Sequence, residues 1–162
     1  MKKSMEQRRY ESGRSMVEMV GVLAITGLIT AGAFILIRAG LASQKRSRAA
    51  DEVATVVASV RGLSVEREDF ANLPAYDGKY SCEGNSANLA AAMLGGTGSA
   101  ATPFSTNSCY YAAQGTKPEW FEVVLVNIPA NDCTVLASRA WAESLNVACS
   151  NKTNLVIRYG KD

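Results

Sequence analysis

An uninterrupted apolar stretch separates a short polar beginning of the chain from a longer mixed remainder. Residues 19–37 read MVGVLAITGLITAGAFILI without a charge, and residues 1–15 are polar and basic. At about 1.5 Å per residue, a helix of this length spans about 28 Å, close to the hydrocarbon thickness of a bilayer. The pattern therefore predicts a transmembrane helix over about residues 16–37.

After Arg38 the apolar residues take the spacing of an amphipathic helix. They recur at i, i+3, i+4 and i+7 in a stripe formed by Ala49, Val53, Val56, Val57, Val60 and Leu63. We expect one long helix over residues 14–63. Its first half is suited to an apolar environment, and its second half is suited to covering a sheet.

Residues 64–162 carry shorter signals. Residues 66–80 are typical of a loop, and residues 95–99 are interpreted as a turn because they lack the Gly-Lys-Ser/Thr ending of a phosphate-binding loop. The regular elements expected are a short helix over 88–94, a strand over 120–128, a helix over 133–141 capped by Asn131 or Asp132, and a strand over 155–159. A long helix followed by this mixture predicts an α+β fold.

The four cysteines all follow the apolar stretch, and none is spaced as CxxC. They are Cys82, Cys109, Cys133 and Cys149. An even number on one side of a membrane segment predicts two disulfides in an oxidising compartment. Four buried thiols in a reducing compartment are the alternative. The sequence alone allows three ways of pairing the cysteines.

Composition gives no sign of catalysis. The chain has no histidine, which removes the usual general base and the commonest metal ligand. No nucleophile stands beside an obvious base, so we expect no enzyme activity, no metal and no cofactor. The formal net charge is +2, and residues after position 13 hold 13 basic and 13 acidic side chains. A neutral body of this kind predicts no specific binding of nucleic acid.

Glu18 stands one residue before the uncharged stretch, where a carboxylate is costly without a partner. A secretory signal peptide, with Gly40 and Ala42 as a loose cleavage site, is one interpretation of the segment. A plain membrane anchor is another, but it has no use for the acid. Basic residues lie on both sides of the apolar stretch, so charge alone does not decide which end of the helix faces the cytoplasm. The cysteines favour an oxidising compartment for the residues after the stretch.

The segment from Gly13 to Glu18 (GRSMVE), preceded by a basic leader and followed at once by the apolar stretch, resembles the processing site of type IV prepilins and type II secretion pseudopilins. In that family a membrane aspartic peptidase cuts after the glycine, and a glutamate is the fifth residue of the mature chain. The resemblance implies a leader of residues 1–13, cleavage between Gly13 and Arg14, and a role for Glu18 in assembly.

The resemblance also implies a fold and partners. A pilin fold packs a long N-terminal helix, with a transmembrane first half, on a small antiparallel sheet in a head over residues 64–162. The implied partners are further copies of the chain, the prepilin peptidase, the assembly platform of the inner membrane and the membrane lipid. The precursor would lie in the inner membrane of a Gram-negative bacterium with its head in the periplasm, and the assembled filament would be extracellular.

The C-terminal pattern is similar to the type IVb pilins, which include the toxin-coregulated, bundle-forming and conjugative thin-pilus subunits. A strand ends at Ile128-Pro129, one cysteine opens a helix, and a second lies 16 residues later. This similarity implies the pairs Cys133–Cys149 and Cys82–Cys109. It favours the major subunit of a pilus. The alternatives are a minor pilin or pseudopilin and, from another class, a membrane-tethered periplasmic binding module in which Glu18 is incidental.

Overall fold

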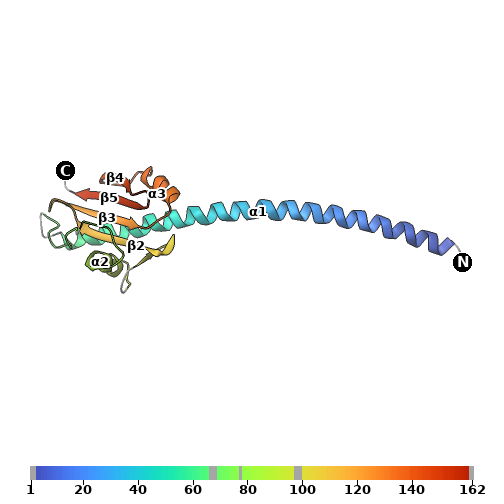
Figure 1. Ribbon diagram of the computed structural model, residues 1–162, viewed down its shortest axis with the longest axis horizontal. Helices are drawn as coiled ribbons and strands as arrows, with labels where there is room; N and C mark the ends of the chain where they lie inside the picture. The colour runs from blue at the N-terminus through green and yellow to red at the C-terminus, as the bar shows by residue number, and fades with distance from the viewer. Residues whose placement is uncertain (1–2, 66–68, 77, 97–99, 161–162) are drawn as a thin grey trace. The chain divides into compact units, whose positions relative to one another are not determined.

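The computed structural model describes residues 3–65, 69–76, 78–96 and 100–160, with side chains from Met16 onward. The chain divides into two compact units, an N-terminal unit of Met1–Ser43 and a head of Gln44–Asp162. Helix α1, Lys3–Leu63, contributes to both units (Figure 1). The division therefore falls inside the long helix, and residues Gln44–Leu63 belong to the head.

The head is built around a five-stranded antiparallel sheet with the order β1-β2-β3-β5-β4. The last strand of the chain, β5, therefore lies between β3 and β4. The strands are β1 Ala101–Thr102, β2 Ser105–Gln114, β3 Trp120–Val126, β4 Ser144–Ser150 and β5 Asn154–Gly160. A long apolar N-terminal helix with a small antiparallel sheet confirms the expected α+β arrangement.

One face of the sheet, called here the inner face, packs on the second half of α1. Five members of the predicted stripe are buried in a single core, namely Ala49, Val53, Val56, Val57 and Val60. They share that core with Phe121, Val123 and Leu125 of β3, which point to one side because side chains alternate along a strand. Leu63, expected to extend the stripe, is 58% exposed. The buried stripe ends at Val60.

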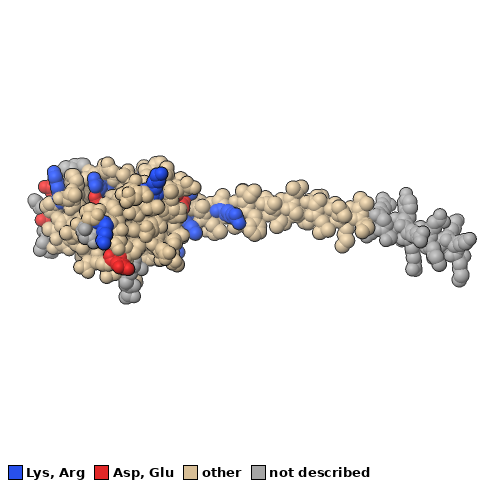
Figure 2. All heavy atoms as spheres, viewed as in Figure 1, with Lys and Arg blue, Asp and Glu red and all other residues tan. Residues whose placement is uncertain are grey.

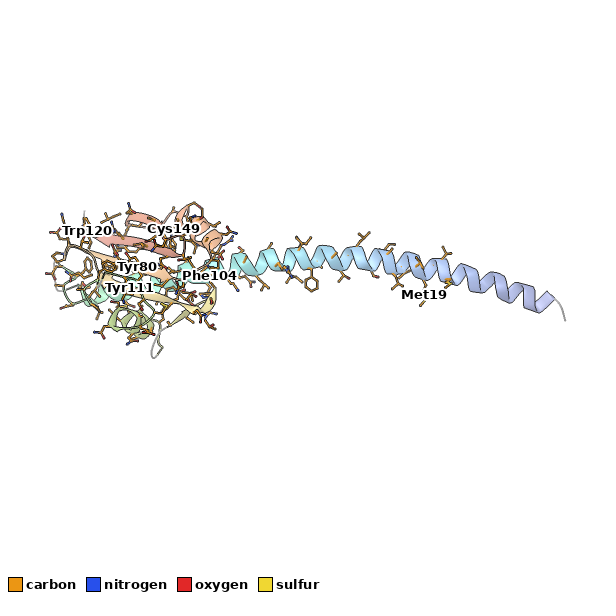
Figure 3. All side chains as sticks on the ribbon, viewed as in Figure 1. Met19, Tyr80, Phe104, Tyr111, Trp120 and Cys149 are labelled. Atoms are coloured by element: carbon orange, nitrogen blue, oxygen red, sulfur yellow. A yellow bond between two sulfur atoms is a disulfide. The ribbon has the colours of Figure 1, made fainter. Side chains whose placement is uncertain are left out.

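The opposite, outer face of the sheet is also covered. Its buried side chains include Tyr111, Val124 and Val156, and Tyr76 and Tyr80 of the preceding loop pack against them. Figure 3 labels Tyr80 and Tyr111 within the head. Their rings meet edge to face with centroids 5.6 Å apart, a favoured aromatic geometry. With both faces covered, the central strands are buried along most of their length.

Two short helices complete the head. Helix α2, Asn85–Met93, begins three residues before the predicted 88–94. Helix α3, Ala130–Ala137, begins three residues before the predicted 133–141 and ends four residues earlier. The N-cap of α3 is Pro129, without a side-chain hydrogen bond, so the expected capping by Asn131 or Asp132 is wrong. Proline suits this place because its fixed φ is compatible with a helix start and it has no N–H to satisfy.

The remaining predictions from sequence have mixed outcomes. The strand predicted over 120–128 ends two residues earlier, at Val126, and the strand predicted over 155–159 is longer by one residue at each end. Of the predicted turn over 95–99, only Gly95 and Gly96 lie among the described residues. Gly95 has a φ of 77°, which glycine adopts without steric cost. Strands β1, β2 and β4 were not predicted.

The two edges of the sheet are irregular. Strand β1 has only two residues and a register shift between Ala101 and Thr102. Strand β4, at the other edge, has a shift between Ser144 and Asn146, so that Leu145 bulges from the ladder. Short and bulged strands are common at sheet edges, where they interrupt the row of unpaired backbone groups.

Candidate functional site

The three residues of the predicted processing and assembly site all belong to helix α1. Gly13 and Arg14 both lie in this helix, and the side chain of Arg14 is outside the described ones. Glu18 is one turn further on and is exposed. The spacing between Arg14 and Glu18 is four residues, which places two positions on the same face of a helix.

Glu18 stands at the start of an extensive apolar surface. Thirteen large hydrophobic side chains from position 16 to 37 are each at least 58% exposed, and these are Met16, Val17, Met19, Val20, Val22, Leu23, Ile25, Leu28, Ile29, Phe34, Ile35, Leu36 and Ile37. In Figure 2 this stretch is tan on the face shown, although Glu18 also belongs to it. Soluble proteins rarely expose a contiguous apolar surface of this extent, so it requires a covering of lipid or protein.

This segment also satisfies the membrane criterion of length and composition. Among the described residues, one helix is long and apolar enough to cross a membrane, beginning at Met16, with an 18-residue window of mean hydropathy 2.4. A signal sequence near an N-terminus meets the same criterion. The N-terminal unit can therefore anchor the chain in a membrane.

The polar side chains inside this stretch find hydrogen-bond partners within the helix. The Thr26 hydroxyl lies 2.9 Å from the carbonyl oxygen of Val22, and the Thr30 hydroxyl lies 2.7 Å from that of Thr26. Bonding back by four residues satisfies a threonine hydroxyl without water. The helix surface therefore presents no unsatisfied threonine to an apolar surrounding, and Glu18 remains as its one ionisable group between residues 16 and 37.

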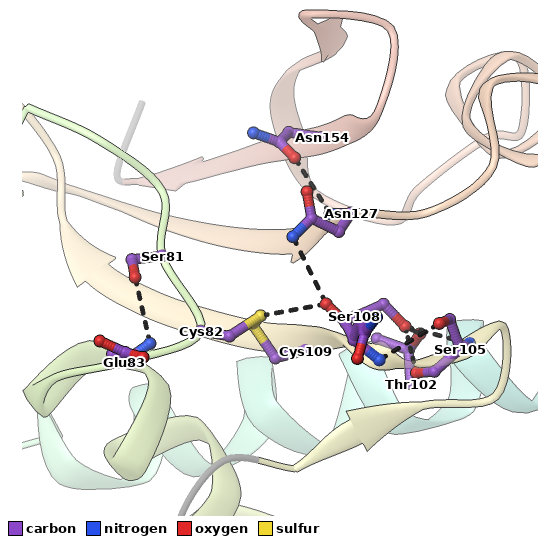
Figure 4. Close-up of a disulfide and its surroundings, with 10 residues drawn as sticks. Ser81, Cys82, Glu83, Thr102, Ser105, Ser108, Cys109, Asn127 and Asn154 are labelled. Atoms are coloured by element: carbon purple, nitrogen blue, oxygen red, sulfur yellow. Dashed lines mark hydrogen bonds between the residues drawn. A yellow bond between two sulfur atoms is a disulfide. The ribbon is translucent and has the colours of Figure 1, made fainter.

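Both disulfides lie in the head, and they are the two pairs that the resemblance implied. Cys82–Cys109 joins the loop before α2 to strand β2 across 27 residues (Figure 4). Cys133–Cys149 joins helix α3 to strand β4 across 16 residues. Figure 4 also shows Asn127, whose side-chain nitrogen donates to the carbonyl oxygen of Asn107 at 3.4 Å. The disulfides thus tie the outer loop to β2 and the edge strand β4 to α3.

A buried carboxylate at the outer face is a feature that was not predicted from sequence. Glu122 of β3 is 4% exposed and accepts hydrogen bonds from the Tyr80 hydroxyl at 2.8 Å and from Nε of Arg158 at 2.6 Å. Burial and the bond to Glu122 raise the pKa of Tyr80 well above its ordinary value. The signal in the sequence was the single acid within the strand WFEVVLV.

A second carboxylate ties the amphipathic part of α1 to strand β2. Glu52 accepts hydrogen bonds from Nε of Arg48, one turn earlier on α1 at 2.7 Å, and from the hydroxyl of the buried Tyr110. Burial, with the bond to Glu52, raises the pKa of Tyr110 above its ordinary value. Nearby, Nε of Arg46 lies 2.7 Å from Oδ1 of Asp132, which links α1 to α3. Within the head, these contacts fix β2 and α3 on the second half of α1.

A groove of about 350 Å³ lies beside α1 on the head. Its apolar floor is formed by Ala54, Val57, Ala58 and Trp141, and an ion pair of Arg61 with Glu143 stands at its wall. Glu143 has a φ of 58°, a left-handed conformation uncommon for a residue other than glycine. The ion pair with Arg61 places the Glu143 carboxylate beside the end of α1.

The polar clusters of the head link elements to one another. Within the part of the chain that the structure describes, no group of three His, Cys, Asp or Glu side chains is placed to hold a metal ion. The buried Glu122 and the partly exposed Glu52 are each engaged by a tyrosine and an arginine, which suits them to holding elements together. No family model, curated protein or solved structure matches this chain.

Proposed function

We propose that this chain is the precursor of a type IV pilus subunit, of the type IVb-like group and in the role of major pilin. The prepilin peptidase removes residues 1–13, and the mature chain, beginning with Arg14, polymerises into a helical filament. The observation that supports this most directly is Glu18, an ionisable side chain on a helix surface that is otherwise apolar and exposed.

The physical argument concerns what can neutralise Glu18. Cleavage after Gly13 creates a new α-amino group on Arg14, one helical turn from the acid. In a bundle of apolar helices, the carboxylate of one copy and the amine of the next each require a partner. A desolvated ion pair contributes little net stability, but misalignment leaves a charge unpaired, so the pair fixes the axial stagger between copies.

The exposed apolar surface of α1 supports both stages of this function. Before assembly, the segment anchors the subunit in the inner membrane with its head in the periplasm. During assembly, the platform transfers the subunit to the base of the filament, where lipid contacts are exchanged for contacts with other copies of α1. The threonines bonded within the helix require no new partners in either setting.

The head supports the proposal by its construction. A pilin fold covers the second half of the long helix with an antiparallel sheet. Here the sheet covers the stripe of α1 from Ala49 to Val60 in the same way. The disulfide Cys133–Cys149 bounds a C-terminal region that includes α3 and β4, the arrangement expected for the type IVb group. Such staples suit a small domain that works outside the cell.

The proposal is tested by the mature N-terminus and by one substitution. Mass spectrometry of the protein from its native cells is expected to show a chain beginning at Arg14. Glu18→Ala is expected to remain in the membrane fraction but to yield few filaments by shearing and electron microscopy. The exposed Glu83 of the head gives a control, because Glu83→Ala removes an acid without touching α1. A mature chain that still begins at Met1, without filaments, would support a tethered binding module instead.

A further inference from the structure

The groove beside α1 has an apolar floor that the head itself leaves open. Ala54 and Ala58 are exposed, and they are separated by four residues, which places them on one face of the helix. Trp141 forms part of the lining, and its indole nitrogen is already engaged with the carbonyl oxygen of Leu136 at 2.8 Å. The available surface of the groove is therefore mainly apolar and suits an aliphatic side chain.

The same head carries an aliphatic projection that is not covered. Leu63 at the end of α1 is 58% exposed and Val65 is 80% exposed, which makes them the two most exposed large hydrophobic side chains described in the head. Leu63 follows Ala54 by nine residues, a rotation of about 180° at 3.6 residues per turn. The projection and the groove therefore face opposite sides of one helix, and a chain cannot fill its own groove with Leu63.

We propose that Leu63 and Val65 of one copy seat in the groove of the next copy. This inference rests on the proposed function and deepens it by assigning a contact between heads, separate from the packing of the apolar halves of α1. A contact between two different surfaces of one chain is heterologous, and such contacts propagate into helical filaments when the rotation does not close. A second copy is favoured as the occupant because the complementary feature is on this chain.

The ion pair between Arg61 and Glu143 limits where an aliphatic side chain can bind in the groove. Both residues line the groove, so an incoming side chain meets a charged pair there beside the apolar lining. Aliphatic side chains such as Leu63 and Val65 match the floor. A polar side chain in their place would lose its water without gaining a partner.

The experiment places a photo-reactive residue in the full-length chain, expressed together with the unmodified chain so that mixed filaments form. Illumination of filaments carrying Val65→p-benzoylphenylalanine is expected to give dimers, with adducts mapped by mass spectrometry to residues 54–58 or 141–143 of the second copy. The same probe at Leu63 provides a second position. Val135→p-benzoylphenylalanine is the matched control, because Val135 is 45% exposed but lies on α3.

A blocking substitution completes the design. Ala58→Trp in the unmodified chain fills the groove and is expected to lower the yield of these adducts about tenfold, the effect of losing about 1.4 kcal/mol of contact free energy. Filaments whose adducts from both positions map elsewhere would overturn the contact and leave the pilin proposal intact. A wild-type chain that forms no filaments and keeps its first 13 residues would overturn the pilin proposal itself.

Discussion

The Tyr80 hydroxyl donates a 2.8 Å hydrogen bond to Glu122, so that a loop residue is held by a carboxylate buried within the sheet. Arg158 of the neighbouring strand β5 bonds the other carboxylate oxygen at 2.6 Å. The cross-strand pairing of Glu122 with Arg158 places this ion pair directly beneath the loop. Glu122 therefore joins three segments of the head at one point.

Removing this carboxylate is expected to destabilise the head. Glu122→Ala leaves the Tyr80 hydroxyl without its acceptor and Arg158 without its counter-charge, and the loss should be about 3 kcal/mol in the free energy of unfolding. Thermal and urea unfolding of the detergent-solubilised chain measure it. Glu119→Ala, which removes an exposed acid just before the same strand, should change stability by less than about 0.5 kcal/mol. Equal effects of the two substitutions would contradict the role given to Glu122.

The buried tyrosines predict a loss of stability in alkali. Burial raises the pKa of Tyr159 to about 12, against the opposing effect of Arg61, and the pKa values of Tyr80 and Tyr110 are raised further. Above pH 10 the unfolded chain releases phenolic protons that the folded chain keeps. Stability is therefore complete below pH 10 and falls as the pH rises towards 12, by about 1.4 kcal/mol per pH unit for each such tyrosine.

Unfolding curves between pH 8 and pH 12, with phenolate absorbance followed in parallel, test this expectation. Tyr80→Phe should make the decline less steep, because it removes one group that titrates only on unfolding. A decline that is unchanged in Tyr80→Phe would show that Tyr80 titrates normally in the folded head.

The two disulfides should contribute unequally in the chain-entropy model. Cys133 and Cys149 are 16 residues apart, and replacing both by serine should lower the free energy of unfolding by about 3 kcal/mol. Cys82 and Cys109 are 27 residues apart, and replacing both should lower it by about 3.5 kcal/mol. Unfolding under oxidising conditions measures both losses. A non-reducing peptide map of the wild-type chain provides the check on pairing, and a Cys82–Cys133 peptide would refute it.

The ion pair of Arg46 with Asp132 should couple α1 to α3 measurably but weakly. Their side chains are 31% and 18% exposed, so the pair is partly screened by solvent. A double-mutant cycle with Arg46→Ala, Asp132→Ala and both together should give a coupling of about 0.5–1 kcal/mol, which decreases in high salt. Arg48 and Asp132 give the reference cycle, since Arg48 bonds Glu52 instead.

Two glycines offer opposite expectations for the same substitution. A Cβ on Gly160 would lie 2.9 Å from the carbonyl oxygen of Glu119 and 2.8 Å from Cδ1 of Trp120. Gly160→Ala should therefore destabilise the head by about 1–3 kcal/mol. Gly62, in the last turn of α1, has nothing within 4 Å of that position, and Gly62→Ala should stabilise the helix by about 0.5 kcal/mol. Thermal unfolding that ranks the two variants in the reverse order would contradict the close packing at Gly160.

The predictable parts of the fold were those with a strong local period. The stripe from Ala49 to Val60 has the helical spacing and is buried as expected, and the β-branched strand at Val123 was evident from composition. Strand β2 was missed because it begins with polar residues and carries alanines, and only coverage of both faces by distant segments explains its burial. Such coverage leaves no local signature.

The same reasoning applies to the polar contacts. Glu18 was identifiable because a charge beside an apolar stretch is conspicuous in the sequence itself. The partners of Asp132 and Glu122 lie 86 and 36 residues away, at Arg46 and Arg158, and pairing over such separations depends on the tertiary fold. The sequence around Asp132 therefore predicts a helix cap, whereas its carboxylate pairs with Arg46 of α1.

The irregular edges of the sheet bear on how such a chain could aggregate. A two-residue strand ending in Thr102 at one border and a bulge at Leu145 on the other give an incoming strand little regular backbone to extend. Edge-to-edge pairing of the sheets of different copies into amyloid-like assemblies is therefore disfavoured. This limits a competing, disordered route of association for the filament growth proposed above.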